Sequence, residues 1–441
     1  MKIFLILLLP LLLSCSFDSK TGIWKNIYDV ELEEDERFKD FETLYTGTKT
    51  FNKEVQVSKD FNPKLEPIQK VLIWDDEFYN QTNKLDNFSY QNKNELVFKS
   101  KRISKYEVNN NILFDGENII LTDSKGNIIV YSITKQKVQF KFNFYKKRIK
   151  KIKKKLRIIL ENNLIYIADN LGYIYSVDYV NKKLVWAKNY KSPFRSNLKI
   201  FKDKIIVSDQ DNSLYILNKF NGEKIKIIPT EDVILKNKFI NSLAIKNEDL
   251  LFLNTFGSLY SLNMYVNRIK WFINLNPSSD LEKSGLFYSN QLILHDNFIL
   301  ISTDPYLYVL NKSNGSTLVR KAITSTIEPI LSNDKVFLVT KDNLLVCLNL
   351  LSGKVNYSIN INKQVRKYLN TKKQKPVSIQ SIRLVNDNLF IFLKSSYVIE
   401  LNARGLIKSI KKLPAKLNTF PIFLNDSILY LDKKNKLVIL N

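Results

Sequence analysis

The stretch that decides the fold is residues 156–190, which read LRIILENNLIYIADNLGYIYSVDYVNKKLVWAKNY. Its apolar segments of strand length are 156–160, 164–169, 173–178 and 183–188, and short turns at 161–163 and 170–172 separate the first three. β-Branched and aromatic runs bounded by Asn, Asp and Gly are typical of strands joined by tight turns. The stretch therefore predicts four consecutive antiparallel strands, the unit from which propeller blades are built.

The same unit recurs along the chain at spacings of roughly 40 to 50 residues. One column of the repeat, within the third strand, holds Ile129, Tyr175, Tyr215, Tyr260, Tyr308, Val346, Ile399 and Val438. The third strand ends on Ser132, Asp178, Asn218, Asn263, Asn311, Asn349, Asn402 and Asn441, where Asx side chains can cap the next turn. Glycines occupy the turn before the third strand (Gly126, Gly172, Gly257) or the turn after it (Gly222, Gly315, Gly353, Gly405). A repeat of this period in an all-β sequence predicts a propeller with eight blades.

The two ends of the repeat region predict how the ring closes. The last repeat, 427–441, stops after its third strand, and residues 95–100 (ELVFKS) resemble the outer strand at 183–188. A closed ring removes the raw edge that an open one would leave. We therefore expect an all-β fold over residues 94–441, an eight-bladed propeller of four-stranded antiparallel blades whose last blade is closed by an N-terminal strand.

The first residues are typical of an exported lipoprotein. Residues 1–14 carry Lys2 and a short apolar run, and Leu12-Leu13-Ser14-Cys15 resembles a lipobox, in which cleavage exposes a cysteine that is lipidated. The run is too short to span a bilayer. We expect a signal peptide over 1–14, lipidation at Cys15 and a partly irregular N-terminal tether over 15–93; the alternative is an ordinary secretory leader with an incidental cysteine. Ser16 after the cysteine implies, by resemblance to Gram-negative lipoproteins, sorting to the outer membrane, with the propeller facing the periplasm.

Charge is strongly positive but dispersed. The chain of 441 residues has 68 Lys and Arg against 43 Asp and Glu, a net charge of +25. Two runs depart from the background, the acidic residues 29–36 and the basic residues 146–157. The basic run fits a solvated connection between blades or a surface for anionic lipid or an acidic partner, and export argues against nucleic acid. The acidic run fits a solvated linker or a segment that recruits a basic surface.

Two outer strands carry a family resemblance. Tyr173–Asp178 followed by KLVW at 183–186, and Ser258–Asn263 followed by IKW at 269–271, resemble the repeat of the PQQ-like propellers. With the lipobox and the repeat number, the chain resembles the BamB family of outer-membrane lipoproteins over the leader and roughly residues 95–441. That resemblance implies a non-enzymatic scaffold of the outer-membrane β-barrel assembly complex. Its partners would be the periplasmic domains of a BamA-like subunit and unfolded outer-membrane protein clients.

The resemblance also suggests partner-binding residues. A family loop with an arginine just after an early outer strand matches 191–196 (KSPFRS), so that Phe194 and Arg195 become candidate contacts for the BamA-like subunit. The alternative is a turn shaped by Pro193 with a solvated arginine. A second family loop that carries paired aspartates falls here around 237–240 (NKFI), which has no acid.

An enzyme is the competing class, because PQQ dehydrogenases share the repeat. The family resemblance implies a vicinal cysteine pair, calcium ligands and an aspartate base in those enzymes, whereas the two cysteines here, Cys15 and Cys347, are far apart. Cys347 is expected to be a buried structural thiol and His295 a strand-to-turn residue, while Trp186 and Trp271 are expected to pack between blades. The acids Asp169, Asp209 and Asp304 recur at equivalent turns. We therefore expect no catalytic residue, no metal site and no cofactor; the alternative is a cofactor- or glycan-binding propeller, possibly a quinoprotein dehydrogenase.

Overall fold

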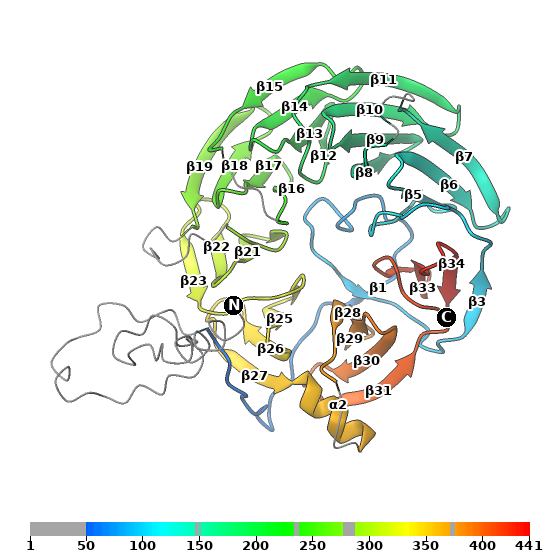
Figure 1. Cartoon of the computed structure of the whole chain (residues 1–441). Helices are drawn as coiled ribbons and strands as arrows, with labels where there is room; N and C mark the ends of the chain where they lie inside the picture. Colours follow the sequence, from blue (N-terminus) through cyan, green and yellow to red (C-terminus); the bar gives the residue numbers. More distant parts are fainter. Residues whose placement is uncertain (1–49, 146–148, 150, 233–237, 277–286, 371–374) are drawn as a thin grey trace, which may run out of the picture. The chain divides into compact units, whose positions relative to one another are not determined.

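The fold consists of β-sheets that follow one another around a ring (Figure 1). The computed structural model describes residues 50–441 except 146–148, 150, 233–237, 277–286 and 371–374. The leader, Cys15 and the acidic run 29–36 lie outside the described residues. Within 50–441 the sheets are arranged around a central axis, and in the sheet that joins the chain ends β3 is the outer strand (Figure 1).

Seven sheets contain four strands each. Three of them follow one another from residue 113: β4–β7 (Leu113–Phe114, Asn118–Thr122, Asn127–Ser132, Lys137–Asn143), β8–β11 (Leu156–Glu161, Leu164–Asp169, Tyr173–Asp178, Lys183–Asn189) and β12–β15 (Lys199–Phe201, Lys204–Ser208, Leu214–Asn218, Lys224–Ile228). The next three are β16–β19 (Ser242–Lys246, Asp249–Leu253, Ser258–Asn263, Arg268–Asn274), β20–β23 (Ile293–His295, Phe298–Ser302, Leu307–Asn311, Thr317–Lys321) and β24–β27 (Ile330–Ser332, Lys335–Val339, Leu344–Asn349, Val355–Asn360). The seventh joins the chain ends, with β32–β34 (Ile422–Leu424, Ser427–Leu431, Leu437–Leu440) and β3 (Leu96–Lys99).

The remaining sheet has six strands and corrects the prediction. β28–β31 (Ile379–Val385, Asn388–Leu393, Tyr397–Asn402, Ile407–Lys412) form an ordinary blade, and β1 (Ile68–Gln69) and β2 (Asn87–Phe88) extend it toward the axis. β2 pairs in parallel with β28, where Asn87 lies opposite Leu384. The prediction of eight four-stranded antiparallel blades is therefore confirmed for seven sheets and wrong for this one, because β2 pairs with the inner edge of β28 and β1 pairs with β2.

The expected closure by an N-terminal strand is confirmed. β3 pairs antiparallel with β34, so that Leu96 lies opposite Leu440 and Lys99 opposite Val438. A further bond from Ser100 N to Leu437 O, 2.9 Å long, continues the ladder. The outer edge of β34 is thus covered by a strand from the other end of the described chain.

The predicted turn chemistry is present in each complete repeat. Asp178 Oδ1 accepts a hydrogen bond from Asn181 N at 2.8 Å, and Asn218 Oδ1 accepts one from Phe220 N at 2.8 Å. A β-bulge that the sequence did not predict recurs between the third and outer strands, at Ser176/Val177 in one sheet and Ser261/Leu262 in another. Because a bulge increases local twist, its repetition turns each outer strand in the same way.

Residues 50–93 differ most from expectation. The sequence assigned them to a tether, yet they pack in one compact unit with the propeller. Trp74 and Phe88 are buried, and Figure 1 shows the blue segment crossing the centre of the ring. We call residues 66–91 the axial segment. No apolar period marks it, because it is held by hydrogen bonds to the inner strands more than by one apolar face.

The axial segment contacts the innermost strand of every sheet. The residues that it contacts are Phe114 (β4), Ile159 (β8), Lys199 (β12), Ile245 (β16), Leu294 (β20), Ser332 (β24), Leu384 (β28) and Phe423 (β32). Many of these contacts are backbone hydrogen bonds, such as Leu160 N to Asp75 O at 2.9 Å and Ile245 N to Gln81 O at 2.7 Å. The inner edge of each blade would otherwise present unpaired amides to the channel. The axial segment provides hydrogen-bond partners for some of these inner-edge backbone groups.

Candidate functional site

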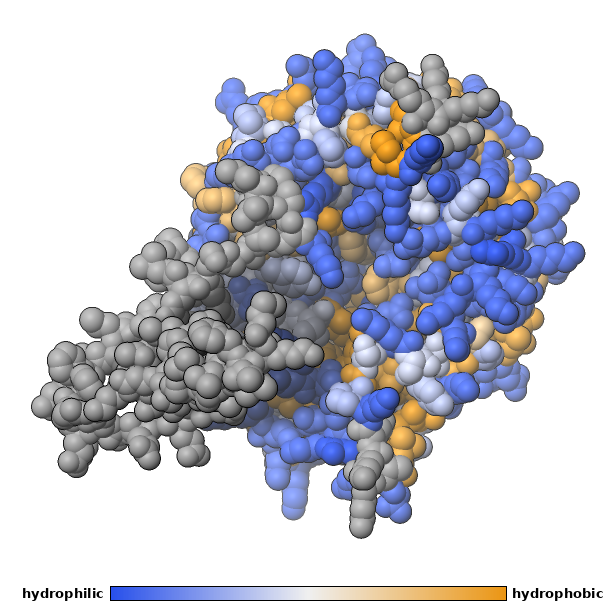
Figure 2. Space-filling model, in the orientation of Figure 1, coloured by the Kyte–Doolittle hydropathy of each residue, from blue (hydrophilic) through white to orange (hydrophobic). Residues whose placement is uncertain are grey.

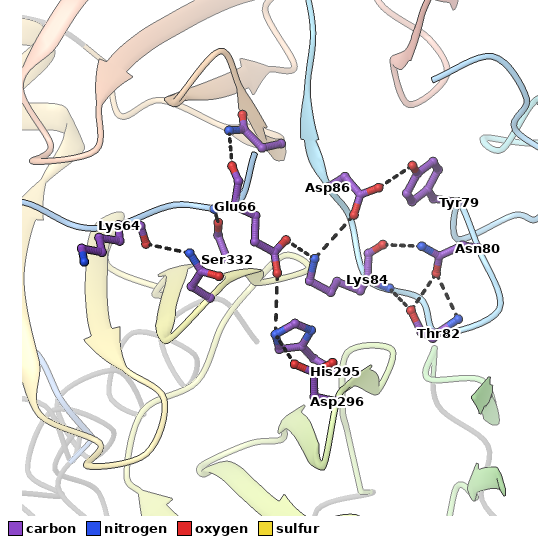
Figure 3. Close-up of polar contacts among 12 residues, drawn as sticks. Lys64, Glu66, Tyr79, Asn80, Thr82, Lys84, Asp86, His295, Asp296 and Ser332 are labelled. Carbon is purple, nitrogen blue, oxygen red and sulfur yellow. Dashed lines mark hydrogen bonds and ion pairs between the residues drawn. The ribbon is translucent and has the colours of Figure 1, made fainter. Parts of the chain in front are cut away.

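A polar network fills the axial channel on one side (Figure 3). Lys84 forms ion pairs with Glu66 and, at 3.5 Å, with Asp86, and Tyr79 donates its hydroxyl to Asp86 Oδ2 at 2.6 Å. These side chains all come from the axial segment and point toward one another in Figure 3. The cation of Lys84 is therefore neutralised within the segment itself.

His295 joins this network from the propeller wall. It is the last residue of β20, as expected for a strand-to-turn position. Its Nε2 lies 3.6 Å from Glu66 Oε1 and 3.5 Å from Asp296 Oδ2. Burial lowers the pKa of His295, and the nearby Lys84 charge lowers it further, while Asp296 and Glu66 act in the opposite direction. The imidazole is thereby biased toward its neutral form.

A buried ion pair anchors the axial segment to β12. Lys199 Nζ lies 2.6 Å from Asp76 Oδ2, with side-chain exposures of 0% and 2%. Lys199 also donates to Asn80 O at 2.8 Å. Burial raises the pKa of Asp76 and lowers the pKa of Lys199, and the partner's charge opposes the shift in each case. Such a pair is costly to break, since removing one partner leaves an uncompensated buried charge.

The two predicted partner-binding residues have different environments. Phe194 is 4% exposed, and its ring meets Tyr190 and Tyr215 edge to face within the core between two blades. Its amide bonds to Asp169 O at 2.9 Å, which directs the side chain inward. The Phe194 side chain is therefore part of the core between the two blades. Successive side chains of an extended backbone point to opposite faces, so the Arg195 side chain points away from the core that holds Phe194.

Arg195 is half-buried beside residues 238–240, and residue 237 of the predicted loop lies outside the described residues. Its Nη2 donates to Phe239 O at 2.9 Å. Burial lowers the pKa of the Arg195 guanidinium, and the charge of Arg157 adds to the effect. The loop that has no acid in this chain is thus held by Arg195 through a backbone carbonyl.

A groove next to Arg195 collects cations from the basic run. Its cavity volume is about 400 Å³, and its lining includes Lys153, Lys154, Lys155, Arg157 and Lys238, which we call the basic groove. Glu77 lies in its lining as well, and accepts from Arg157 Nη1 at 3.1 Å and from Ile158 N at 3.1 Å. The C-terminal part of the basic run therefore converges with residues 238–240, as no local sequence pattern could show.

Not all of these cations are accessible. Lys154 is buried, donates to Ile149 O and lies 4.9 Å from the centre of the Tyr145 ring. Lys153 forms an ion pair of 2.6 Å with Glu107, and both side chains are exposed. Lys155 and Lys238 are exposed. The basic groove thus offers an anionic partner exposed lysines and one half-buried arginine, Arg157.

A second cavity, of about 740 Å³, is lined by turns of the β4–β7 and β8–β11 sheets and by the axial segment. Its lining includes the carboxylates Asp75, Asp115, Glu117 and Glu161. Among the described residues, no group of three or more His, Cys, Asp or Glu side chains is placed to hold a metal ion.

The structural predictions for the sulfur and indole side chains are confirmed. Cys347 is fully buried in β26, and burial raises the pKa of its thiol to about 12. Trp186 and Trp271 each donate an indole N–H to the next sheet, to Lys219 O at 2.9 Å and Lys312 O at 3.1 Å. Sequence reasoning missed the axial segment, for which the buried aromatics Trp74, Phe88 and Tyr90 were the available signal.

No family model matches the sequence, and no curated protein matches it detectably. Solved structures do resemble the fold. BamB from Moraxella catarrhalis matches with a TM-score of 0.61 at 14% identity over 79% of this chain and 99% of that one. A europium-containing methanol dehydrogenase matches with a TM-score of 0.60 at 10% identity, covering 83% and 89% of the two chains. The quinohemoprotein alcohol dehydrogenase from Comamonas testosteroni matches with a TM-score of 0.61 at 9% identity, covering 84% and 81%.

These identities establish similarity of fold, and the fold is shared by scaffolds and enzymes. No helix in the described part of the chain has the length and apolar character needed to cross a membrane. Radial four-stranded sheets, closure by an N-terminal strand and indoles packed between blades together give this chain a β-propeller fold similar to that of the BamB structure.

Proposed function

We propose that the chain is a non-enzymatic scaffold lipoprotein of the outer-membrane β-barrel assembly complex, which docks on the periplasmic domains of a BamA-like subunit. The observation that carries the proposal is the filled axial channel. Residues 73–83 form hydrogen bonds or ion pairs to the inner strands β4, β8, β12, β16 and β20, so a small molecule on the axis would compete with the chain's own backbone. Surfaces rather than a central pocket then remain for binding.

Arg195 and the basic groove form the proposed docking surface. A partly desolvated arginine beside exposed lysines suits a carboxylate-bearing loop, because the guanidinium can present two parallel N–H donors. Arg195 already holds Phe239 O, and a partner would add to this arrangement at the same rim. Phe194 contributes indirectly, through the packing that fixes the backbone before Arg195.

The anchor and the clients belong to the same proposal. Cys15 would carry the acyl chains that hold the protein at the periplasmic side of the outer membrane. Unfolded outer-membrane clients would pair with the free edges of outer strands such as β11, where Leu184 and Val185 are 40% and 41% exposed. A strand-pairing mode reads backbone and so accepts many sequences.

Co-purification from solubilised membranes tests the docking. We expect the barrel-forming subunit to be recovered with the tagged full chain, and Arg195→Glu to reduce recovery at least tenfold. Arg268→Glu is the matched control, because Arg268 is an exposed arginine at the start of β19. Equal recovery with Arg195→Glu and Arg268→Glu would remove Arg195 from the contact, and absence of the subunit from every preparation would overturn the scaffold role.

The alternative function is a cofactor- or glycan-binding propeller, possibly a quinoprotein dehydrogenase. Its support is the similarity to two alcohol dehydrogenase structures together with the 740 Å³ cavity. Incubation of the purified protein with pyrroloquinoline quinone and Ca²⁺, followed by gel filtration, tests it. Co-elution of quinone with alcohol-dependent dye reduction would establish the alternative and displace the scaffold.

A further inference from the structure

A short helix on the rim of the ring has an apolar stripe that the propeller covers only in part. α2 (Ile361–Leu369) follows β27, lies against β27 and β31, and projects outward at the bottom of Figure 1. Ile361, Val365, Tyr368 and Leu369 have the spacing of one helical face. The first two are buried, whereas Tyr368 and Leu369 are 49% and 46% exposed. The last turn of the stripe is therefore left open to solvent.

Cations surround the open end of the stripe. α2 contains Lys363, Arg366 and Lys367 and no acidic residue, and Arg366 and Lys367 are exposed. β31, which packs beside it, adds Lys408, Lys411 and Lys412, again without an acidic residue. The closest carboxylate partner of α2 is Glu54, which pairs with Lys363 at 2.5 Å and not with the cations of the last turn. An aromatic and a leucine flanked by cations are typical of helices that lie in the interface of an anionic bilayer.

The start of the described chain adds an independent argument. Val55 pairs with Ser358 of β27, and Phe51 N bonds to Ala322 O at 2.8 Å, so the chain joins the propeller beside α2. Residues 16–49 separate that point from Cys15, which limits the distance from a Cys15 acyl group to Thr50 to roughly 120 Å at full extension. A lipid anchor at Cys15 would thus be connected to the propeller on the side of the ring that carries α2. One acyl signal gains stability from a nearby basic patch.

We propose that α2 and β31 form a membrane-contacting surface, in which Tyr368 and Leu369 insert at the headgroup level of an anionic lipid bilayer while Arg366, Lys367, Lys408 and Lys412 bind lipid phosphates. The orienting role rests on the proposed Cys15 anchor, but the lipid affinity of α2 does not. The surface would set the orientation of the propeller on the membrane and leave the basic groove, which comes from the β4–β19 region, for a protein partner.

Vesicle co-sedimentation tests the proposal. The mature chain from residue 15, with Cys15→Ser to prevent acylation, is mixed with vesicles of phosphatidylethanolamine and phosphatidylglycerol, and separately with pure phosphatidylcholine vesicles. We expect binding to the anionic vesicles alone. Neutralising Arg366 and Lys367 to glutamine, which preserves helix propensity, should lower the partition coefficient about 25-fold, at about fivefold for each cation. Tyr368→Ser with Leu369→Ser should lower it several-fold.

The control variant neutralises two exposed lysines on the outer strand β15, Lys224→Gln and Lys226→Gln. It should change partitioning less than twofold, and unchanged unfolding midpoints would exclude misfolding of any variant. Equal losses in the α2 and β15 variants would mean that the net charge of +25 binds lipid without a defined surface, and would overturn the proposal. Absence of binding to the anionic vesicles would also overturn the proposal. This includes the case in which α2 binds an acidic protein and no lipid. Neither result would change the Arg195-dependent recovery of the assembly subunit. The docking proposal and the membrane-contact proposal can therefore fail independently.

Discussion

The indole of Trp186 lies on the backbone of Gly222 in the neighbouring sheet. A Cβ placed at Gly222 would come within 2.4 Å of Trp186 Cε3. The same relationship joins Trp271 to Gly315, where the distance would be 2.7 Å. The outer strands β11 and β19 are thus each attached to the next sheet, at the turn that follows the third strand of that sheet, by one indole ring, one glycine and one indole hydrogen bond.

Gly222→Ala should therefore destabilise the propeller by about 2–4 kcal/mol in free energy of unfolding, because the methyl group meets the indole and the residue has a positive φ of 70°. Gly116→Ala is the control, since Gly116 has a φ of 107° and nothing lies within 4 Å of an added Cβ. That variant should lose about 1 kcal/mol through backbone strain alone. Urea denaturation measures both, and equal losses would show that the indole contact contributes nothing.

The repeated part of the fold could be predicted because each blade carries the same sequence pattern of strands and turns. Asp178, Gly172 and Trp186 have equivalents in other repeats, so strands, turns and contacts between blades followed from alignment of the repeats within the chain. The recurrent bulge was not predicted, since a bulge adds no apolar signal of its own. Site residues were harder. Phe194 and Arg195 are neighbours in sequence, and which of them faces inward is decided by the backbone contacts of Phe194 with Asp169 and Asp209.

The axial segment escaped prediction for a different reason. Its residues contact the inner strands of successive sheets around the ring. The positions that make these contacts therefore have neither the spacing of a helix nor that of a strand. Asn83 illustrates this, because its Nδ2 donates to both Leu243 O and Leu292 O at 2.9 Å, on two neighbouring sheets. From the sequence alone, an asparagine in a polar stretch indicates a loop.

Asn83→Ala should cost about 2–4 kcal/mol, because Leu292 O and Leu243 O each lose a hydrogen bond, Leu243 O keeping the one from Asn197 Nδ2, and the residue has a φ of 59°. Asn92→Ala provides the comparison, with a similar φ of 62° but only 3.4 Å contacts from its Nδ2 to Glu400. The Asn92 variant should lose about 1 kcal/mol or less. Chemical denaturation followed by tryptophan fluorescence reports both, and an Asn83 variant as stable as the Asn92 variant would mean that the axial segment does not brace those two sheets.

The ion pair of Asp76 and Lys199 should show strong coupling. Lys199→Met should lower the free energy of unfolding by about 3–5 kcal/mol, since it leaves the Asp76 carboxylate without its cation in a buried site. Adding Asp76→Asn should recover part of the loss and give a double-mutant cycle with a coupling energy above about 1 kcal/mol. Lys246→Met, which breaks the exposed pair with Asp296, should cost less than about 1 kcal/mol. Additive losses for Asp76 and Lys199 would contradict the inferred coupling.

The pH dependence of stability should reveal His295, the one histidine of the chain. Burial and Lys84 lower its pKa in the folded state below the ordinary value of 6.5, so the unfolded chain takes up a proton first as the pH falls. The contribution of His295 is therefore present above pH 6.5 and is lost as the pH falls through the folded-state pKa. Burial raises the pKa of Asp76 and Glu77, which gives a pH dependence of opposite sign. Comparison of the wild type with His295→Gln at pH 7.5 and pH 5.0 separates the two contributions, because the carboxylates are common to both proteins. The wild type should lose more stability between those two pH values than the variant does. An identical change in both proteins would place the protonation of His295 outside the folding equilibrium, and would remove the polar network around Glu66 and Lys84 as its cause.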